Sequence, residues 1–121
     1  MQTMQTERQR SGKAAEARAR DHLEQQGMTA LAVNWHCRLG ELDLVMRDGS
    51  AVVFVEVRYR ARGDFGGALE SIDRAKQRRI ARTASAWLQR HARGEPPCRF
   101  DVVAVDGEGG IEWIADAFQL D

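Results

Sequence analysis

The stretch from Gly40 to Arg60, G-E-L-D-L-V-M-R-D-G-S-A-V-V-F-V-E-V-R-Y-R, constrains the fold of this chain more than any other part. Two runs rich in valine, leucine and phenylalanine flank the tetrapeptide Arg47-Asp48-Gly49-Ser50. An Asp-Gly pair favours the positive φ angles of a tight turn, and apolar runs on either side of it are typical of two paired strands. We therefore expect a β-hairpin here.

Three carboxylates interrupt the apolar arms of this hairpin. Side chains alternate between the two faces of a strand, so Glu41 and Asp43 share one face of the first arm. By the same rule, Glu56 and Arg58 share one face of the second arm. Like charges that converge in an apolar setting require a compensating cation, and a divalent metal ion is one such cation.

An ordinary hairpin surface is the alternative interpretation of the same residues. An antiparallel hairpin often has one solvated face, on which the acids would pair with Arg58 and Arg60. However, Val52 and Phe54 lie on the same face as Glu56, which makes that face a poor solvent surface. The strand pattern alone leaves both interpretations open.

Length and composition indicate one soluble globular domain. The chain has 121 residues, of which 43% are hydrophobic and 30% charged. We expect a disordered, polar tail over residues 1–11 and a single domain over residues 12–121. No apolar run approaches the ~20 residues that span a membrane, and residues 1–11 contain no apolar signal segment. These features predict a cytoplasmic protein without a membrane partner.

The sequence lacks the patterns of two common classes of site. Cys37 and Cys98 lack C-x-x-C spacing, so we expect reduced thiols and no disulfide framework. No GxxxxGK or GxGxxG segment is present, which argues against a glycine-rich phosphate-binding loop.

Charge is distributed unevenly along the chain, although 18 basic and 18 acidic residues give a formal net charge of zero. Seven cations and no acid lie between Arg74 and Arg93, whereas six acids and no base lie between Asp101 and Asp121. A local basic stripe can bind a polyanion whatever the net charge, although charged helix surfaces are usually only solvated. If the partner is nucleic acid, we expect DNA rather than RNA. The expected contacts are then Arg60, Arg62, Lys76, Arg78, Arg79 and Arg82.

Two helices flank the hairpin in the predicted order of elements. Ser11 is expected to cap the first helix, which would run through about Gln26 with Ala15, Ala19 and Leu23 as its apolar line. The second helix is expected to begin after Ser71 or Asp73 and to end before Gly94. Its predicted buried stripe consists of Ile80, Ala84, Trp87 and Leu88.

Three further strands complete the prediction. They are expected at residues 28–33, 99–105 and, for a short last strand, 111–114. The order α-β-β-β-α-β predicts a three-layer α/β fold in which helices pack on both sides of a mixed sheet.

Four segments, taken together, resemble the bacterial YraN-like family of uncharacterised small proteins. They are G-E-L-D-L-V, F-V-E-V-R-Y-R, K-Q-R-R-I-A-R-T-A-S-A-W-L and R-F-D-V-V-A-V, in this order and spacing, and the similarity covers nearly the whole chain. That family is assigned to the restriction-endonuclease-like fold and resembles archaeal Holliday-junction resolvases. The resemblance therefore implies a nuclease-like protein that acts on structured or branched DNA and, by analogy, forms a homodimer.

The resemblance also implies a metal site of the D…(D/E)xK kind. By position, Asp43 matches the first acid and Glu56 the second. Glu16 matches a first-helix glutamate near the metal, although its spacing to Arg20 alone predicts a surface ion pair. Glu41 belongs to the same motif without an assigned role. These carboxylates would hold Mg²⁺ or Mn²⁺ through hard oxygen ligands, and the ion would activate water.

Arg58 stands where the pattern has lysine. A lysine can position or deprotonate the attacking water, whereas a guanidinium, with a pKa above ~12, stays charged and can only stabilise negative charge. Lys76, near the start of the second helix, could supply an amine instead, and a simple phosphate contact is its other expected role.

Three classes of function remain open from the sequence. The first is a metal-dependent endonuclease with Asp43, Glu56 and Arg58 as catalytic residues. The second is a nucleic-acid-binding module whose nuclease site is degenerate. The third is a protein-interaction domain whose basic helix binds an acidic partner.

Overall fold

The computed structural model describes residues 7–60 and 67–119, with side chains described from Gly12 onward. Its elements confirm the predicted order, including the last strand expected from residue 111. They are α1 (Glu7–Gln25), β1 (Thr29–Cys37), β2 (Gly40–Asp48), β3 (Ala51–Tyr59), α2 (Arg74–His91), β4 (Cys98–Val105) and β5 (Ile111–Phe118).

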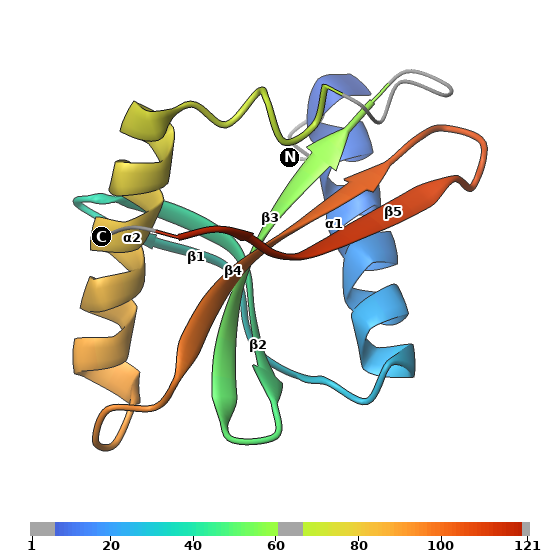
Figure 1. Cartoon of the computed structure of the whole chain (residues 1–121). Coiled ribbons are helices and arrows are strands. Elements are labelled where there is room, and N and C mark those ends of the chain that lie inside the picture. The colour runs from blue at the N-terminus through green and yellow to red at the C-terminus, as the bar shows by residue number, and fades with distance from the viewer. Residues whose placement is uncertain (1–6, 61–66, 120–121) are drawn as a thin grey trace, which may run out of the picture.

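The five strands form one mixed sheet in the order β1-β2-β3-β4-β5. Neighbouring strands are antiparallel except β3 and β4, which are parallel and joined through α2. The two helices cover opposite faces of the sheet (Figure 1). This arrangement confirms the predicted restriction-endonuclease-like three-layer core.

The central strand β3 is buried on both faces, because each face packs against a different helix. Val53, Val55 and Val57 share a cluster with the apolar line of α1. Val52 and Phe54 share the other cluster with the buried stripe of α2. Both predicted helical stripes therefore face the sheet, and burial of apolar side chains on both sides fixes β3 in the middle of the fold.

Local signals position the hairpin and α2 as predicted. Gly49 has a φ of 61° in the turn between β2 and β3. Asp73 caps α2, since its carboxylate accepts the backbone N–H of Lys76 at 2.8 Å.

The first helix begins earlier than predicted. It starts at Glu7, four residues before the expected cap at Ser11. Glu, Arg and Gln are good helix formers, so the segment before Ser11 continues the helix. Residues 1–6 of the expected tail lie outside the described residues, and the single-domain organisation stays a prediction.

Strands β1 and β5 extend beyond their predicted ends, because each tolerates an irregular residue. Asn34 in β1 and Asp116 in β5 both have a φ of 52°, a conformation that Asn and Asp adopt more readily than most residues. The buried Asp101 holds β5 past this point, since its carboxylate accepts the N–H of Asp116 and the indole N–H of Trp113, each at 2.9 Å.

No helix within the described ranges is long and apolar enough to cross a membrane.

Candidate functional site

At one end of the sheet, the two strands of the hairpin, β2 and β3, separate from each other. The register of β2 with β3 runs from the turn only as far as Leu44 opposite Val55. Beyond that pair, β2 continues beside β1 down to Gly40, whereas β3 continues beside β4 up to Tyr59. Figure 1 shows the end of β3 running away from the connection between β1 and β2. The residues that follow the last pair therefore border a gap.

Asp43 lies at the point where the two strands separate. Its Oδ2 atom accepts the backbone N–H of Val57 at 2.9 Å, so the carboxylate takes the place of a strand partner. The separation of the two strands thus leaves the N–H of Val57 free to hold the carboxylate of Asp43, one of the predicted acids, in position.

A cleft of about 700 Å³ occupies this opening and is bordered by both helices. Residues from both faces of β3 line it, since Val57 and Tyr59 border the same space as Glu56 and Arg58. All four predicted acids are among its lining residues, and so are three cations. The acids are Glu16, Glu41, Asp43 and Glu56, and the cations are Arg58, Lys76 and Arg79.

Glu56 is a buried carboxylate with only 8% of its surface exposed. Its Oε1 atom lies 3.3 Å from Nη2 of Arg58 and 3.9 Å from Nζ of Lys76. Burial and then the negative charge of Asp43 raise the pKa of Glu56 to about 7, although Arg58 and Lys76 act in the opposite direction. The two cations therefore compensate only part of the cost of charging this site.

Asp43 and Glu16 share this electrostatic environment. Burial raises the pKa of Asp43 above its usual value, even though the hydrogen bond from Val57 and the charge of Arg58 favour the ionised form. Burial, followed by the charges of Asp43 and Glu41, raises the pKa of Glu16 to about 7. Three carboxylates are thus held where negative charge is disfavoured, which is a common property of functional sites.

Glu41 lies at the exposed edge of the cleft, 3.4 Å from Nδ1 of His36. The regular alternation used to group it with Asp43 is wrong for this part of β2. Leu42 packs in the cluster on the α2 side and Leu44 in the cluster on the α1 side, so the strand twists between them. The acids converge because the sheet opens here, and not because they share one regular face.

Arg58 carries unused hydrogen-bond donors. Its Nε and Nη2 atoms are buried and have no hydrogen-bond partner within the described residues, so the contact with Glu56 is an ion pair only. Directly after the strand, Nη2 of Arg60 donates to the carbonyl of Gly67 at 3.3 Å. Because a buried donor without an acceptor costs free energy, Arg58 is suited to an anionic ligand in the cleft.

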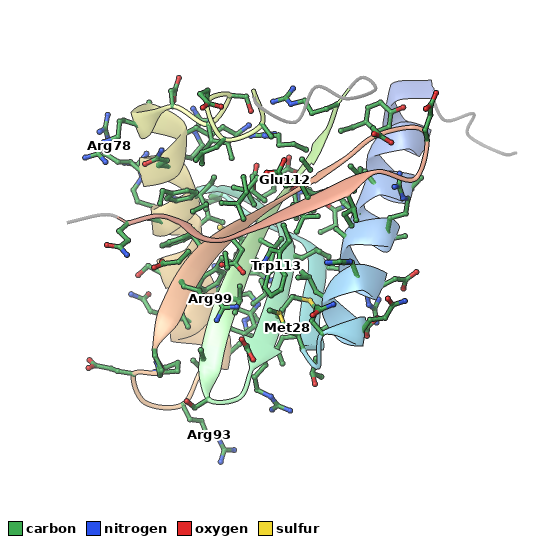
Figure 2. The ribbon with its side chains drawn as sticks, turned by 45° about the vertical axis from the view of Figure 1, so that its right-hand side comes forward. Met28, Arg78, Arg93, Arg99, Glu112 and Trp113 are labelled. Carbon is green, nitrogen blue, oxygen red and sulfur yellow. The ribbon has the colours of Figure 1, made fainter. Side chains whose placement is uncertain are left out.

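The cations of α2 do not form one surface, contrary to the simple picture of a basic stripe. Lys76 and Arg79 line the cleft, whereas Arg78 and Arg82 are exposed and are not among its lining residues. Figure 2 shows Arg78 pointing away from the sheet. Arg90 instead lies over the ring of Trp35, 5.5 Å from its centroid. The predicted contact Arg62 lies outside the described residues.

Comparison with known proteins gives the family. Residues 15–105 match the uncharacterised protein family UPF0102. The chain belongs to this family. It is 52% identical over 118 residues to a UPF0102 protein of Stutzerimonas stutzeri, an alignment that covers 94% of this chain and 98% of the relative. A UPF0102 protein of Alkalilimnicola ehrlichii is 54% identical over 109 residues, covering 89% and 86%. These matches confirm the YraN-like family assignment made from the sequence motifs.

Several residues that line the cleft of this UPF0102 protein were missed by the sequence interpretation. They include His36, Cys37, Tyr59 and Thr83. Regular strand alternation would place Tyr59 on the face opposite Arg58 and Glu56, so its position in the sequence does not mark it as a site residue. The usable signal was its position at the end of β3, because at an open strand end both faces can border the same space.

The donor set of the cleft fits a hard divalent cation only in part. No group of three His, Cys, Asp or Glu side chains suited to a metal ion is found in the described part of the chain. Asp43 and Glu56 nevertheless offer carboxylate oxygens, which Mg²⁺ and Mn²⁺ prefer. Burial, the largest cause of the raised pKa of each, disfavours their negative charge, and a bound cation would compensate that charge. Two carboxylates with retained waters would suffice for weak binding of Mg²⁺, which usually keeps several waters.

Proposed function

We propose that this UPF0102 protein binds nucleic acid and, with Mg²⁺ or Mn²⁺, hydrolyses phosphodiester bonds in structured or branched DNA. The observation that supports it most is the meeting of Asp43 and Glu56 with Arg58 and Lys76 in one open cleft. Two acids with raised pKa beside two cations are unusual for a structural ion-pair network, since burial leaves the acids only partly compensated.

The residues of this cleft have complementary roles in the proposed reaction. Asp43 and Glu56 would hold the divalent ion, which when bound supplies activated water and stabilises charge on the phosphate. Arg58 lies beside Glu56, with Nη2 3.3 Å from its Oε1 atom, and would offer a fixed positive charge to the phosphate. Lys76 lies against the same carboxylate, where its amine can provide the proton-transfer role that a guanidinium cannot.

A binding module without catalysis is the second candidate function. It is favoured by Arg58, which cannot accept a proton from water, and by the lack of three assembled ligands among the described residues. Such a protein would still use Lys76 and Arg79 to contact phosphates in the cleft. A protein-interaction domain is the remaining alternative if nucleic acid does not bind.

A cleavage panel tests these alternatives. Single-stranded, duplex, flap and four-way-junction DNA, and single-stranded RNA, are incubated with Mg²⁺ or Mn²⁺ and the full-length protein. We expect cleavage by the wild type and by the control Glu112→Gln, which removes an exposed acid on β5 outside the cleft (Figure 2). Asp43→Asn and Glu56→Gln should each lower the rate at least about 100-fold, as expected for loss of a residue central to catalysis.

The other results of the panel are also informative. Salt-sensitive binding without cleavage by any metal would contradict the nuclease and support the binding module. Absence of all nucleic-acid binding would exclude both and leave the protein-interaction domain.

A further inference from the structure

Tyr59 is an exposed aromatic side chain on the wall of the cleft. It is 47% exposed, and within the described residues no other Phe, Tyr or Trp is among the large exposed apolar side chains. A single exposed apolar residue is ordinary on a protein surface. What distinguishes Tyr59 is its place, since it follows Arg58 directly at the end of β3 and borders the same space as Glu56.

The ring of Tyr59 rests on a well-supported turn between β4 and β5. A Cβ atom added at Gly107 would lie 2.6 Å from Oη of Tyr59, so the hydroxyl end packs directly on this glycine. The Asp106 carboxylate accepts the N–H of Gly110 at 2.8 Å, and the guanidinium of Arg18 donates to the carbonyls of both residues. The ring is therefore supported at its hydroxyl end, while about half of the residue stays exposed beside the cleft, as a stacking platform requires.

The depth and size of the cleft limit what can reach its acids. Its volume of about 700 Å³ is that of a small-molecule pocket, which can hold a nucleotide or two. Glu56 is only 8% exposed, so a phosphate must enter the cleft to lie beside it. In a duplex the bases are stacked inside the helix, and a nucleotide has to leave that stack before it can enter such a pocket.

We infer that the cleft takes unpaired nucleotides, and that Tyr59 stacks on the base next to the phosphate held by Arg58 and Lys76. This inference rests on the proposed function and specifies its substrate class, namely the single-stranded segments of structured or branched nucleic acid. Stacking of a base on an aromatic ring tolerates any sequence and contributes about 5- to 150-fold to affinity per base.

Binding of a fluorescein-labelled 12-nucleotide oligothymidine to the full chain, measured by anisotropy in EDTA, tests the inference. Tyr59→Ala should weaken binding about 5- to 150-fold, whereas Tyr59→Phe should stay within about 2-fold because the ring remains. Affinity for a blunt duplex of the same length should change less than 2-fold in both variants. The affinity of an RNA oligomer, measured in parallel, shows whether the cleft distinguishes ribose from deoxyribose.

Two controls separate stacking from general damage. Leu39→Ala removes an apolar side chain of matched exposure, 48%, that does not line the cleft, and should leave binding unchanged. Gly107→Ala keeps the tyrosine but must displace the end of its ring, and should weaken single-strand binding in the same direction as Tyr59→Ala. Thermal melting verifies that each variant is folded.

A thermodynamic cycle with the oligomer gives the decisive comparison. Replacing one thymidine at a time by an abasic site should reveal one position at which wild-type affinity falls but that of Tyr59→Ala does not. Unchanged single-strand affinity in Tyr59→Ala, with weaker binding in Lys76→Gln/Arg79→Gln, would overturn the stacking inference and leave the proposed function intact. If the wild type bound no nucleic acid, both would fail.

Discussion

Glu56 is the residue at which burial and charge conflict most clearly. Its pKa is raised from the ordinary value of 4.5 to about 7, chiefly by burial and then by Asp43. The folded state therefore binds more protons than the unfolded state between these two values. The stabilisation from protonated Glu56 is fully present below about pH 4.5 and is lost as the pH rises toward 7.

Glu56→Gln should accordingly stabilise the metal-free protein at high pH. Glutamine resembles the protonated acid, so we expect a gain on the order of 1 to 2 kcal/mol at pH 8 and almost none at pH 4.5. Urea denaturation in EDTA at both pH values measures the difference. A variant that is less stable than the wild type at pH 8 would show that the ion pairs with Arg58 and Lys76 outweigh the burial cost.

Substitution of Arg58 tests whether the proposed cleavage reaction uses a guanidinium group. Two buried nitrogens of Arg58 have no hydrogen-bond partner within the described residues. We therefore expect Arg58→Lys to lower Mn²⁺-dependent cleavage on the order of 10-fold, since the planar pair of donors is lost. DNA affinity should stay within a few fold, because one phosphate contact among several is a small part of binding. Faster cleavage by Arg58→Lys, most visible at alkaline pH, would instead identify a degenerate site that lacks only an amine.

At the scale of elements, α2 presents two different basic sides. Lys76 and Arg79 line the cleft, whereas Arg78 and Arg82 are exposed and do not line it. Each lost phosphate contact removes about 0.7 from the slope of log affinity against log salt for a single strand. Lys76→Gln/Arg79→Gln should therefore flatten that slope by about 1.4, and the charge-matched Arg78→Gln/Arg82→Gln should leave it nearly unchanged. Equal effects of the two pairs would show that the outer side of α2 also contacts the strand.

Gly40 joins the open end of β2 to α2. Its φ of 151° is unfavourable for residues with a side chain, and an added Cβ would lie 2.9 Å from Oγ1 of Thr83. Gly40→Ala should lower the free energy of unfolding by roughly 1 to 3 kcal/mol, as measured in urea. Gly49→Ala is the matched control, because its φ of 61° is also positive but its surroundings are open. Equal losses in the two variants would mean that the contact with Thr83 adds nothing.

The parts of the fold that could be predicted from the sequence are those with local signals. The Asp-Gly turn defined the hairpin, and Asp73 with the spacing of Ile80, Ala84 and Trp87 defined α2. The end of β5 could not be predicted in the same way. It depends on Asp101, a residue distant in sequence, whose carboxylate holds the strand past the irregular Asp116.

The sequence predicted which acids belong to the site, but not how the strands bring them together. The acids stood out because carboxylates in apolar strands are costly, which is a property of the sequence itself. Their convergence depends on the separation of β2 from β3 beyond Leu44 and Val55, which the alternation pattern does not encode. The same separation explains why Tyr59 was missed. Arg79, but not Arg78, lies in the cleft because it shares a helix face with Lys76 and Thr83.

At the scale of the whole molecule, the three layers place a helix on each side of the opening in the sheet. α1 contributes Glu16 and α2 contributes Lys76, so the cleft gathers charges from both outer layers around the central acids. A homodimer, expected from the resemblance to resolvases, stays a prediction.

Titration of Mn²⁺ into the metal-free protein by isothermal calorimetry tests the central claim most directly, because it requires no knowledge of the substrate. We expect weak binding by the wild type, with a dissociation constant on the order of 10⁻⁴ M, since two carboxylates with waters make an incomplete site. Glu112→Gln should bind equally well, and Asp43→Asn/Glu56→Gln should give no binding heat. Equal Mn²⁺ affinity in the wild type and the double variant would contradict the account.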